Sequence, residues 1–433
     1  MSNTADLEQL KAQIQKHFAS LPHDAFQEGK TSMPLSIPTY GWEEVWEAVD
    51  SLLSTRVTMG SKVKQFESLF AQYVGVKHAV MVNSGSSANL LAVSVVTNPT
   101  IKGALRPGDE VITPAVTWAT TIFPIVQCGA VPVLMDVGID TYDIDPGEIE
   151  KAITPRTRAI MLVHLLGNPC DMTAIMAIAR KHNLLVIEDC CEAHGAEHRS
   201  ARVGGIGDIG TFSFFFSHHI STIEGGMIVT NRDDYAELLR EMRAFGWIRE
   251  SSQKDALARQ YPDIDPRFLF VNTGYNFRPT EIQGGFGIHQ INRLEGYIRY
   301  RTDVADYWNK ELAAYSDYLA LARAPEGSRH VWFLYPMMIK PNAPFTRAEL
   351  VKHLESKGVE TRPILAGNIE EQPVMRMINH RKVGDLPVSR AIMRRGLCVG
   401  LNHGVNPERR GAFVRYMSQF MDQVARTRQP ARS

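Results

Sequence analysis

The stretch from residue 78 to residue 96, HAVMVNSGSSANLLAVSVV, decides the fold because it joins a strand to a helix through a loop of small residues. Its first five residues form a short apolar run typical of a strand, and an apolar helix is predicted from Ser86 onward. Further apolar runs follow at helix-length intervals, without the alternation of a half-exposed strand. This pattern predicts an α/β fold whose mostly parallel sheet is covered on both faces. The runs are EVIT (110–113), VPVLMDV (131–137), AIMLVHLL (159–166) and LLVIED (184–189).

The chain is predicted to have three parts. Residues 1–35 read as an N-terminal helix and linker, and residues 36–290 as the large α/β domain. Residues 291–433 are predicted to form a long helix and a small α+β domain, because 332–340 alternates like an antiparallel strand and 346–358 reads as an N-capped helix ended by glycine. The other predicted elements are helices over 5–19, 42–53, 61–73, 280–312 and 406–424, and strands over 211–215 and 226–230.

The composition is that of a soluble globular protein. The chain has 433 residues, of which 44% are hydrophobic, and 47 Lys and Arg balance 47 Asp and Glu. Because no basic cluster is present, we expect neither a nucleic acid nor a membrane surface as partner. No apolar segment approaches the ~18 residues of a membrane helix and no signal peptide is recognisable, which predicts a cytoplasmic protein.

The five cysteines are expected to be reduced thiols, because their number is odd and the chain is long. Cys190, Cys191 and His194 have the composition of a metal site. However, adjacent cysteines point in different directions along a strand, and no second pair of ligands follows. We therefore expect no metal.

Three features suit a ligand with a phosphate and a flat ring, and each has a plainer reading. The segment NSGSSAN (83–89) lies where a strand ends and a helix begins, so backbone N–H groups converge on an anion there, although a plain serine N-cap explains it equally well. Asp189 follows a strand and either holds a cationic ring nitrogen or caps the next element. Trp118 reads as a core aromatic or as a plate for a ring.

Residues 211–226, TFSFFFSHHISTIEGG, are the most informative segment. Two adjacent histidines at a strand end, flanked by hydroxyls and a glycine pair, are poor core residues, and acid–base chemistry by a histidine is the favoured interpretation. The preceding segment GIGDIG (205–210) matches a dinucleotide-binding fingerprint, but a strand follows it where that motif requires a helix. We interpret it as a glycine-rich turn.

Taken in order, NSGSSAN, VIED, TFSFFFSHH and EGG resemble the sugar aminotransferase/dehydratase family of the DegT/DnrJ/EryC1/StrS type, over about residues 36 to 424. The resemblance implies the fold type I architecture of pyridoxal-phosphate-dependent transferases, with 36–290 as the cofactor-binding domain. In that family the lysine that binds the cofactor normally occupies the position of His218. This chain has no lysine between Lys181 and Lys254.

With a histidine at this position, the chain resembles a smaller branch of this family, the sugar 3-dehydratases. These enzymes remove the C3 hydroxyl of a nucleotide-linked 4-keto-6-deoxy sugar in deoxysugar and O-antigen biosynthesis. One kind carries an iron–sulfur cluster on four cysteines downstream of the histidine, and here only Cys398 lies downstream. The chain more closely resembles the kind that acts on GDP-4-keto-6-deoxy-mannose, although its first ~35 residues depart from that kind and leave the nucleotide open. The motifs are VTWAT (116–120), HLLGNP (164–169), GTFSFFFSHHISTIEGG (210–226), RAFGWIR (243–249), GYNFRPTEIQG (274–284) and TRPILAGN (361–368).

The resemblance also implies cofactor, partners and roles. The cofactor is pyridoxal phosphate cycling with pyridoxamine phosphate, L-glutamate regenerates the amine form, ammonia is released, and a homodimer shares its sites. His218 is the catalytic base, and Arg249, Arg278 and His219 are substrate-binding candidates. Two alternatives stay open: an aminotransferase that tolerates histidine, and a non-catalytic sugar-binding homologue. The implied cofactor contacts are Gly85, Ser86, Ser87 and Ser213 for the phosphate, Trp118, Asp189 and Glu192 for the ring, and Asn276 for the phosphate in the neighbouring subunit.

Overall fold

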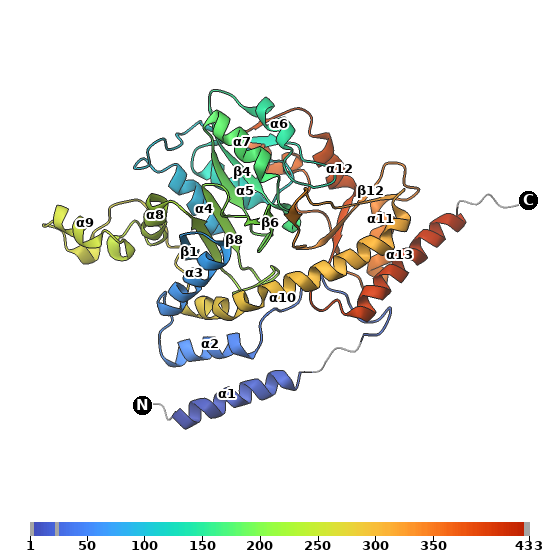
Figure 1. The fold of residues 1–433 in the computed structure, drawn as a ribbon, viewed down its shortest axis with the longest axis horizontal. Coiled ribbons are helices and arrows are strands. Elements are labelled where there is room, and N and C mark those ends of the chain that lie inside the picture. Colours follow the sequence, from blue (N-terminus) through green and yellow to red (C-terminus); the bar gives the residue numbers. More distant parts are fainter. Residues whose placement is uncertain (1–3, 22–25, 428–433) are drawn as a thin grey trace, which may run out of the picture.

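The computed structural model describes residues 4–21 and 26–427, and an eight-stranded sheet forms its centre (Figure 1). The strand order is β1-β9-β8-β5-β4-β2-β3-β14, and β9 runs opposite to both of its neighbours while the other adjacent pairs are parallel. The prediction of a mostly parallel sheet is confirmed. The strands are β1 (His78–Val82), β2 (Glu110–Pro114), β3 (Val131–Met135), β4 (Thr157–Val163), β5 (Leu185–Asp189), β8 (Ile209–Ser213), β9 (Gly226–Thr230) and β14 (Arg381–Lys382).

Helices cover both faces of this sheet, as the unalternating apolar runs predict. Successive strand residues enter opposite cores: Val80 and Val82 pack with α4, α5 and α8, whereas Ala79 and Met81 pack with α3 and α10. Helices α6 and α7 cover the rest of the second face. The helices are α3 (Ser61–Val74), α4 (Gly85–Val96), α5 (Ala119–Gln127), α6 (Pro146–Ala152), α7 (Met172–His182), α8 (Asp233–Arg243) and α10 (Glu281–Leu312).

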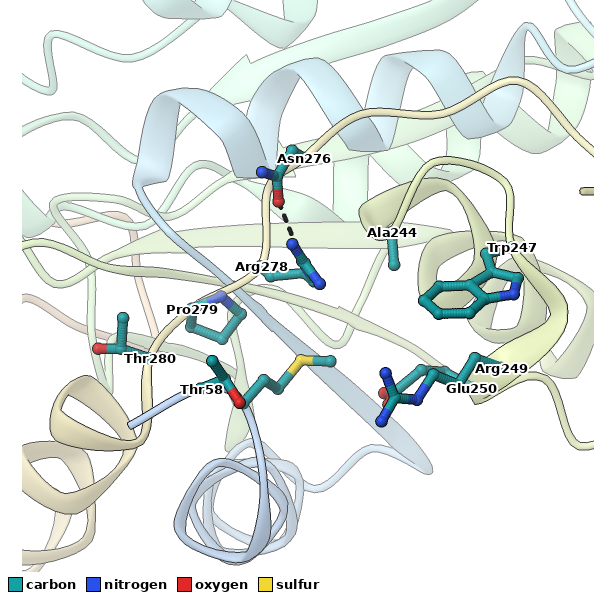
Figure 2. Close-up of a pocket in the computed structure, with 10 residues that line it drawn as sticks. Thr58, Ala244, Trp247, Arg249, Glu250, Asn276, Arg278, Pro279 and Thr280 are labelled. Carbon is teal, nitrogen blue, oxygen red and sulfur yellow. Dashed lines mark hydrogen bonds between the residues drawn. The ribbon is translucent and has the colours of Figure 1, made fainter. Parts of the chain in front are cut away.

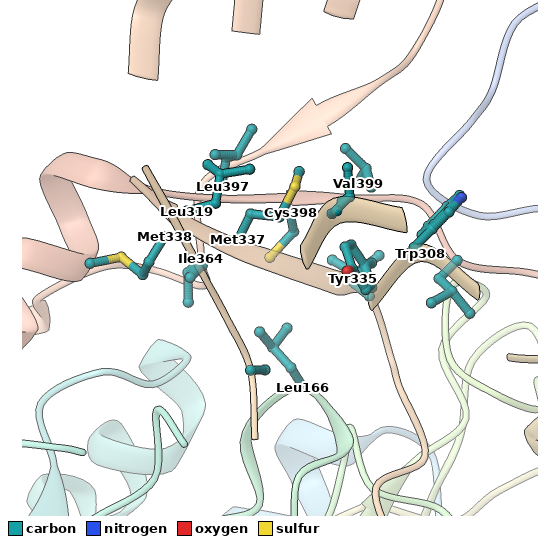
Figure 3. Close-up of a cluster of buried hydrophobic side chains, with 14 of the residues drawn as sticks. Leu166, Trp308, Leu319, Tyr335, Met337, Met338, Ile364, Leu397, Cys398 and Val399 are labelled. Atoms are coloured by element: carbon teal, nitrogen blue, oxygen red, sulfur yellow. The ribbon is translucent and has the colours of Figure 1, made fainter. Parts of the chain in front are cut away.

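A second, four-stranded antiparallel sheet with the order β10-β12-β15-β13 lies towards the C-terminus. Its core packs against α10, α11 and α13, and Leu166, from the loop after β4, points into the same cluster (Figure 3). The long helix α10 therefore touches both sheets' cores. The elements are β10 (Leu319–Leu321), β12 (Tyr335–Ile339), β13 (Thr361–Arg362), β15 (Gly396–Val399), α11 (Arg347–Ser356), α12 (Pro387–Arg395) and α13 (Pro407–Thr427).

Two predicted strands are longer than the structure shows. The run 159–166 was expected to be extended throughout, but β4 ends at Val163 because the chain turns through Leu165–Gly167, with Leu166 at φ 55° and Gly167 at φ 85°. The strand predicted over 332–340 begins only at Tyr335. Both departures lie beside the functional site described below.

The glycine-rich turn at 205–210 is confirmed, because it links β7 to β8 and no helix follows it. The Glu188 carboxylate accepts hydrogen bonds from the backbone N–H groups of Gly204, Ile206 and Gly207 at 2.6–2.9 Å. The turn therefore binds a buried side chain of its own protein. The short sheet β11-β6-β7 consists of β11 (Ser328–Arg329), β6 (Glu197–His198) and β7 (Ala201–Arg202).

The N-terminal helix α1 (Thr4–Ala19) packs on α2 (Trp42–Leu53) at the edge of the molecule (Figure 1). The Lys11 ammonium lies over the rings of Trp42 and Trp46, 5.9 and 5.5 Å from their centroids. Helix α9 (Lys254–Gln260) lies at the opposite edge of the molecule from the four-stranded sheet. None of the helices in the described residues is long and apolar enough to cross a membrane.

Candidate active site

A cavity of about 390 Å³ opens where β5 ends and α4 and α5 begin. The edge at the carboxyl ends of parallel strands is the usual ligand site of open α/β sheets. Seven of the residues singled out from the sequence line this one cavity, although they span 134 positions of the chain. They are Gly85, Ser86, Trp118, Asp189, Glu192, Ser213 and His218.

The start of α4 has the construction that the NSGSSAN motif predicts. Ser84 is the N-cap, and its hydroxyl accepts the Ser87 N–H at 3.1 Å. Gly85 packs so closely on Ser213 that an added Cβ would lie 2.4 Å from the Ser213 Cβ. Ser86 is exposed to the cavity, whereas Ser87 does not line it. The serine N-cap, formed by Ser84, and the anion-binding start of the helix are therefore both present.

Asp189 is a buried carboxylate, 4% exposed, at the cavity floor. It accepts hydrogen bonds from Asn89 Nδ2 at 2.8 Å, Thr121 Oγ1 at 2.9 Å and the Cys191 N–H at 3.2 Å. No cationic side chain of the described residues forms a salt bridge with it. A carboxylate fixed by three neutral donors and facing a cavity fits a cationic ring nitrogen, so the site passes the test for a pyridinium ring.

Trp118 lies in the connection from β2 to α5 and Glu192 in the connection from β5 to β6, and both line the same cavity. Trp118 directly precedes α5 and is 55% exposed, which rules out a core role and fits a plate for a ring. Glu192 is buried and accepts the Leu166 N–H at 2.7 Å. Burial, with a smaller effect of the Asp189 charge, raises the pKa of Glu192 to about 8. A protonated carboxyl there can donate a hydrogen bond to a ring hydroxyl oxygen.

His218 is half-buried at the cavity wall, in the loop after β8. Its ring packs on Phe333, with centroids 5.1 Å apart and planes at 31°. Burial, aided by the positive charge of Arg301, lowers the pKa of His218 to about 3. The imidazole is therefore neutral at physiological pH and can accept a proton. No lysine is among the residues that line the cavity.

His219 was expected to contact substrate, and the structure shows otherwise. Its side chain is completely buried, and Nε2 donates to the Val331 carbonyl at 2.9 Å. Because consecutive residues at this strand end point in different directions, only His218 reaches the cavity.

Arg249, Asn276 and Arg278 lie together in a different cavity of about 270 Å³ (Figure 2). Arg278 Nε donates to Asn276 Oδ1 at 3.0 Å, and its guanidinium lies over the Phe245 ring. This second cavity shares no lining residue with the first. Within one chain, the structure thus divides the predicted site into two separate parts.

Several residues that line the cavity or contact its Asp189 were not predicted from the sequence. Asn89 belongs to the NSGSSAN motif and Thr121 lies one helical turn beyond Thr117, so their spacing was a usable signal for a hydroxyl and an amide facing Asp189. Phe333 gave no such signal, because it comes from the loop before the second sheet and only the tertiary fold brings it to His218.

One cluster in the described residues has the composition of a metal site: His164, Glu188 and Cys190 place ligand atoms within 4.8 Å of one another. It differs from the cysteine group considered in the sequence. His164 Nε2 bonds to Glu188 at 3.1 Å, and its Nδ1 accepts the Cys170 N–H. Both Glu188 oxygens also bind the glycine turn, so these groups already act as hydrogen-bond partners in the fold.

Comparison with known proteins agrees with this site. The chain is 39% identical over 380 residues to GDP-4-keto-6-deoxy-D-mannose 3-dehydratase of Yersinia pseudotuberculosis, covering 87% of this chain and 95% of that protein. It is also 36% identical over 348 residues to GDP-perosamine synthase of Caulobacter vibrioides, covering 80% and 87%. The solved structure of the Escherichia coli GDP-4-keto-6-deoxy-D-mannose 3-dehydratase with hydrated pyridoxal phosphate superposes with a TM-score of 0.83, at 35% identity, covering 90% of this chain and 98% of that one.

Fold and cavity together define a fold type I, pyridoxal-phosphate-dependent enzyme. The sequence model described as the DegT/DnrJ/EryC1/StrS aminotransferase family matches residues 39–416, and the chain belongs to that family. Fold class, family and cofactor predicted from the sequence are confirmed.

Proposed function

We propose that this protein is a 3-dehydratase that removes the C3 hydroxyl of a nucleotide-linked 4-keto-6-deoxyhexose, with GDP-4-keto-6-deoxy-mannose as the substrate to test first. The observation that carries the proposal is His218. It is a neutral imidazole at the wall of a cavity that contains no lysine. Such a group accepts and returns a proton but does not form a covalent link to an aldehyde. The 3-dehydratase name of relatives at 39% identity supports the same reading.

The cofactor is proposed to lie along the cavity floor. Asp189 would pair with the ring nitrogen, the protonated Glu192 would donate to the ring hydroxyl oxygen, and Trp118 would stack on the ring. The start of α4 holds the phosphate through its backbone N–H groups and through serine hydroxyls. The phosphate residues are Gly85, Ser86, Ser87 and Ser213, with Ser87 acting mainly through the cap that it forms with Ser84.

When bound, pyridoxamine phosphate supplies a primary amine for the C4 ketone and a ring that accepts electrons. His218 takes the proton from the cofactor's methylene carbon and returns one to the departing C3 hydroxyl. Asp189 keeps the ring nitrogen protonated. For each hydroxyl removed, one L-glutamate becomes 2-oxoglutarate and one ammonia is released, so glutamate is the reductant.

A homodimer with shared sites is part of the proposal. Arg249, Asn276 and Arg278 line a cavity of their own and provide two cations and an amide. We assign this cavity to the neighbouring subunit's cofactor phosphate and to the anionic groups of the sugar nucleotide or glutamate. Mixing two inactive variants, His218→Asn and Asn276→Ala, is then expected to restore up to about a quarter of the wild-type rate, because half of the dimers regain one intact site.

The decisive experiment compares wild type with His218→Lys, using GDP-4-keto-6-deoxy-mannose, pyridoxamine phosphate and glutamate, and follows ammonia and product mass. Wild type is expected to release ammonia and a 3-deoxy sugar. The lysine variant is expected to lose that activity or to form an amino sugar, and a new visible absorption band is expected when it binds pyridoxal phosphate. His218→Asn is the matched control, because it removes the base without providing an amine.

A stable amino sugar from the wild type would instead establish an aminotransferase, as the name of the perosamine synthase relative suggests. Binding of cofactor or sugar without turnover, also with dTDP- and CDP-linked sugars, would establish a non-catalytic binding protein.

A further inference from the structure

Arg301, in the middle of α10, is a buried cation without an anionic partner. It is 4% exposed, and none of the carboxylates in residues 4–21 and 26–427 forms a salt bridge with it. Its Nη1 donates to the carbonyls of Trp332 at 3.0 Å, Phe333 at 2.8 Å and Leu401. Buried charges are usually paired, because burial without a counter-charge is costly. The positive charge of Arg301 therefore acts on whatever lies nearby.

Burial lowers the pKa values of His194, His218 and His219, and the positive charge of Arg301 lowers each of them further. His194 and His219 are completely buried, and the His194 ring centroid lies 5.9 Å from that of His218 and 5.6 Å from that of His219. Both nitrogens of His194 and the Nδ1 atoms of the other two have no hydrogen-bond partner. Burial, and next the Arg301 charge, keep the pKa values of His218 and His219 below the ordinary range.

The same guanidinium holds the segment that covers His218. Residues 331–333 connect Arg301 to the loop after β4, because Val331 N donates to Gly167 O at 2.9 Å and Phe333 N donates to Leu166 O at 2.8 Å. Trp332 has φ 54°, a strained conformation for a bulky residue that its surroundings must enforce. The Phe333 ring packs on His218. Arg301 thus affects His218 in two ways: through its positive charge, and through the Phe333 ring that it holds against the imidazole.

We propose that Arg301 is a positioning residue that acts through His218: its contacts with the Trp332 and Phe333 carbonyls hold the Phe333 ring against the His218 ring, and its unpaired charge adds to the effect of burial on that ring. This role rests on the proposed function, because a base must be unprotonated before it can accept a proton. Two carboxylates line the cavity, Asp189 and Glu224, and a nearby negative charge favours the charged ring, whereas Glu192 is protonated. The positive charge of Arg301 opposes them, and burial keeps the neighbouring His194 and His219 rings neutral.

Two substitutions separate charge from contact. Arg301→Gln removes the charge and keeps a hydrogen-bond donor, whereas Arg301→Lys keeps the charge and provides a single donor group. We expect the glutamine variant to raise the pKa of His218 by about one unit, the size of effect of one charge acting through an effective dielectric constant near 20. The lysine variant is expected to leave the pKa of His218 near the wild-type value.

The measurement is a histidine NMR titration of the full-length protein without substrate, with the His218 signal assigned by its loss in His218→Asn. His403, whose pKa burial and Arg301 lower to about 4, is a second reporter and should move with His218. His353 is the internal control, because burial lowers its pKa and Arg301 is not among the charges that act on it. A His218 that titrates at the ordinary value in the wild type, or equal behaviour of Gln and Lys variants, would overturn the proposal without any need for the glutamine variant to be active.

The holoenzyme provides the second readout. Because the pKa of His218 is about 3 in the wild type and is expected about one unit higher in Arg301→Gln, kcat of both proteins is expected to stay flat between pH 8 and pH 6. The acid-induced fall in kcat is expected about one pH unit higher in the glutamine variant than in the wild type, with KM for the sugar little changed. If the NMR shifts occur but the wild type has no 3-dehydratase activity, the proposed function fails and the electrostatic role of Arg301 stands. If the activity is present and the NMR shifts are absent, the proposed function stands and the electrostatic role of Arg301 fails.

Discussion

Two groups of polar side chains lie at the same edge of the main sheet but differ in how many of their polar atoms have hydrogen-bond partners. In the His164 cluster, formed by His164 and Glu188, both ring nitrogens and both carboxylate oxygens have hydrogen-bond partners. In the His218 cluster, formed by His194, His218 and His219, four ring nitrogens have none.

The difference separates two uses of buried polarity. A fully bonded group such as the His164 cluster specifies and stabilises the fold, because removing one partner leaves several others unpaired. The His218 cluster lacks those hydrogen bonds and the stability that they provide, so no hydrogen bond fixes a proton on its four unpaired nitrogens. Unpaired polar atoms in a native structure require an explanation, and the proton transfer that we propose for His218 would provide one here.

The largest expected effect comes from breaking the satisfied cluster. Glu188→Ala leaves the His164 ring and three backbone N–H groups without an acceptor, so we expect the free energy of unfolding to fall by about 3–5 kcal/mol. Urea denaturation measures it. The matched control is His194→Phe, which replaces two unpaired nitrogens by an apolar ring and is expected to change stability by less than about 1 kcal/mol. Equal losses in the two variants would remove the distinction between the clusters.

A smaller effect is expected from acid. Burial keeps the pKa values of His194 and His219 well below the unfolded value of 6.5, so the unfolded chain binds these protons first. Their contribution to stability is complete above about pH 6.5 and is lost as the pH falls, at about 1.4 kcal/mol per pH unit and per histidine. Urea midpoints between pH 7 and pH 5 measure it. His194→Phe should make the slope shallower, and an unchanged slope would argue that this ring is already charged in the folded protein.

Glu192, whose pKa of about 8 lies above its ordinary value, is expected to give a pH dependence of the opposite sign. The folded protein keeps this proton while the unfolded chain has lost it, so stability is complete below about pH 4.5 and declines as the pH rises towards 8. Glu192→Gln, a permanent neutral analogue, should gain relative to wild type by at most about 1.4 kcal/mol per pH unit over that range. Parallel curves for the two proteins would show that Glu192 is ionised when folded.

The sequence was sufficient to predict those features of the fold that depend only on residues close together in the chain. The apolar runs predicted the sheet, and a strand following GIGDIG excluded a dinucleotide site, because both depend on neighbouring residues alone. The strand ends were less predictable. Strand β4 ends at Val163 because the chain turns through Leu166 in a left-handed conformation that overrides the apolar pattern, and the Leu166 N–H there donates to Glu192.

The site was only partly predictable for the same reason. Residues at strand and helix ends, such as Asp189 and Ser86, were identified because topology brings those ends together. His219 was assigned wrongly, because adjacency in sequence does not say which ring faces a cavity. Arg301 carried no signal at all: it is one of several arginines on a long helix, and its importance comes from burial and from three carbonyls distant in sequence.

Helix α10 also constrains when the molecule can form during synthesis. Its first half packs on α2 and α3, and Gly284 lies so close to Val63 that an added Cβ would come within 2.6 Å of its backbone nitrogen. The outer layer made from residues 42–74 must therefore wait for more than two hundred further residues to leave the ribosome. Until then the apolar surface of α2 and α3 that packs on α10 stays uncovered, which exposes the nascent chain to aggregation over that interval.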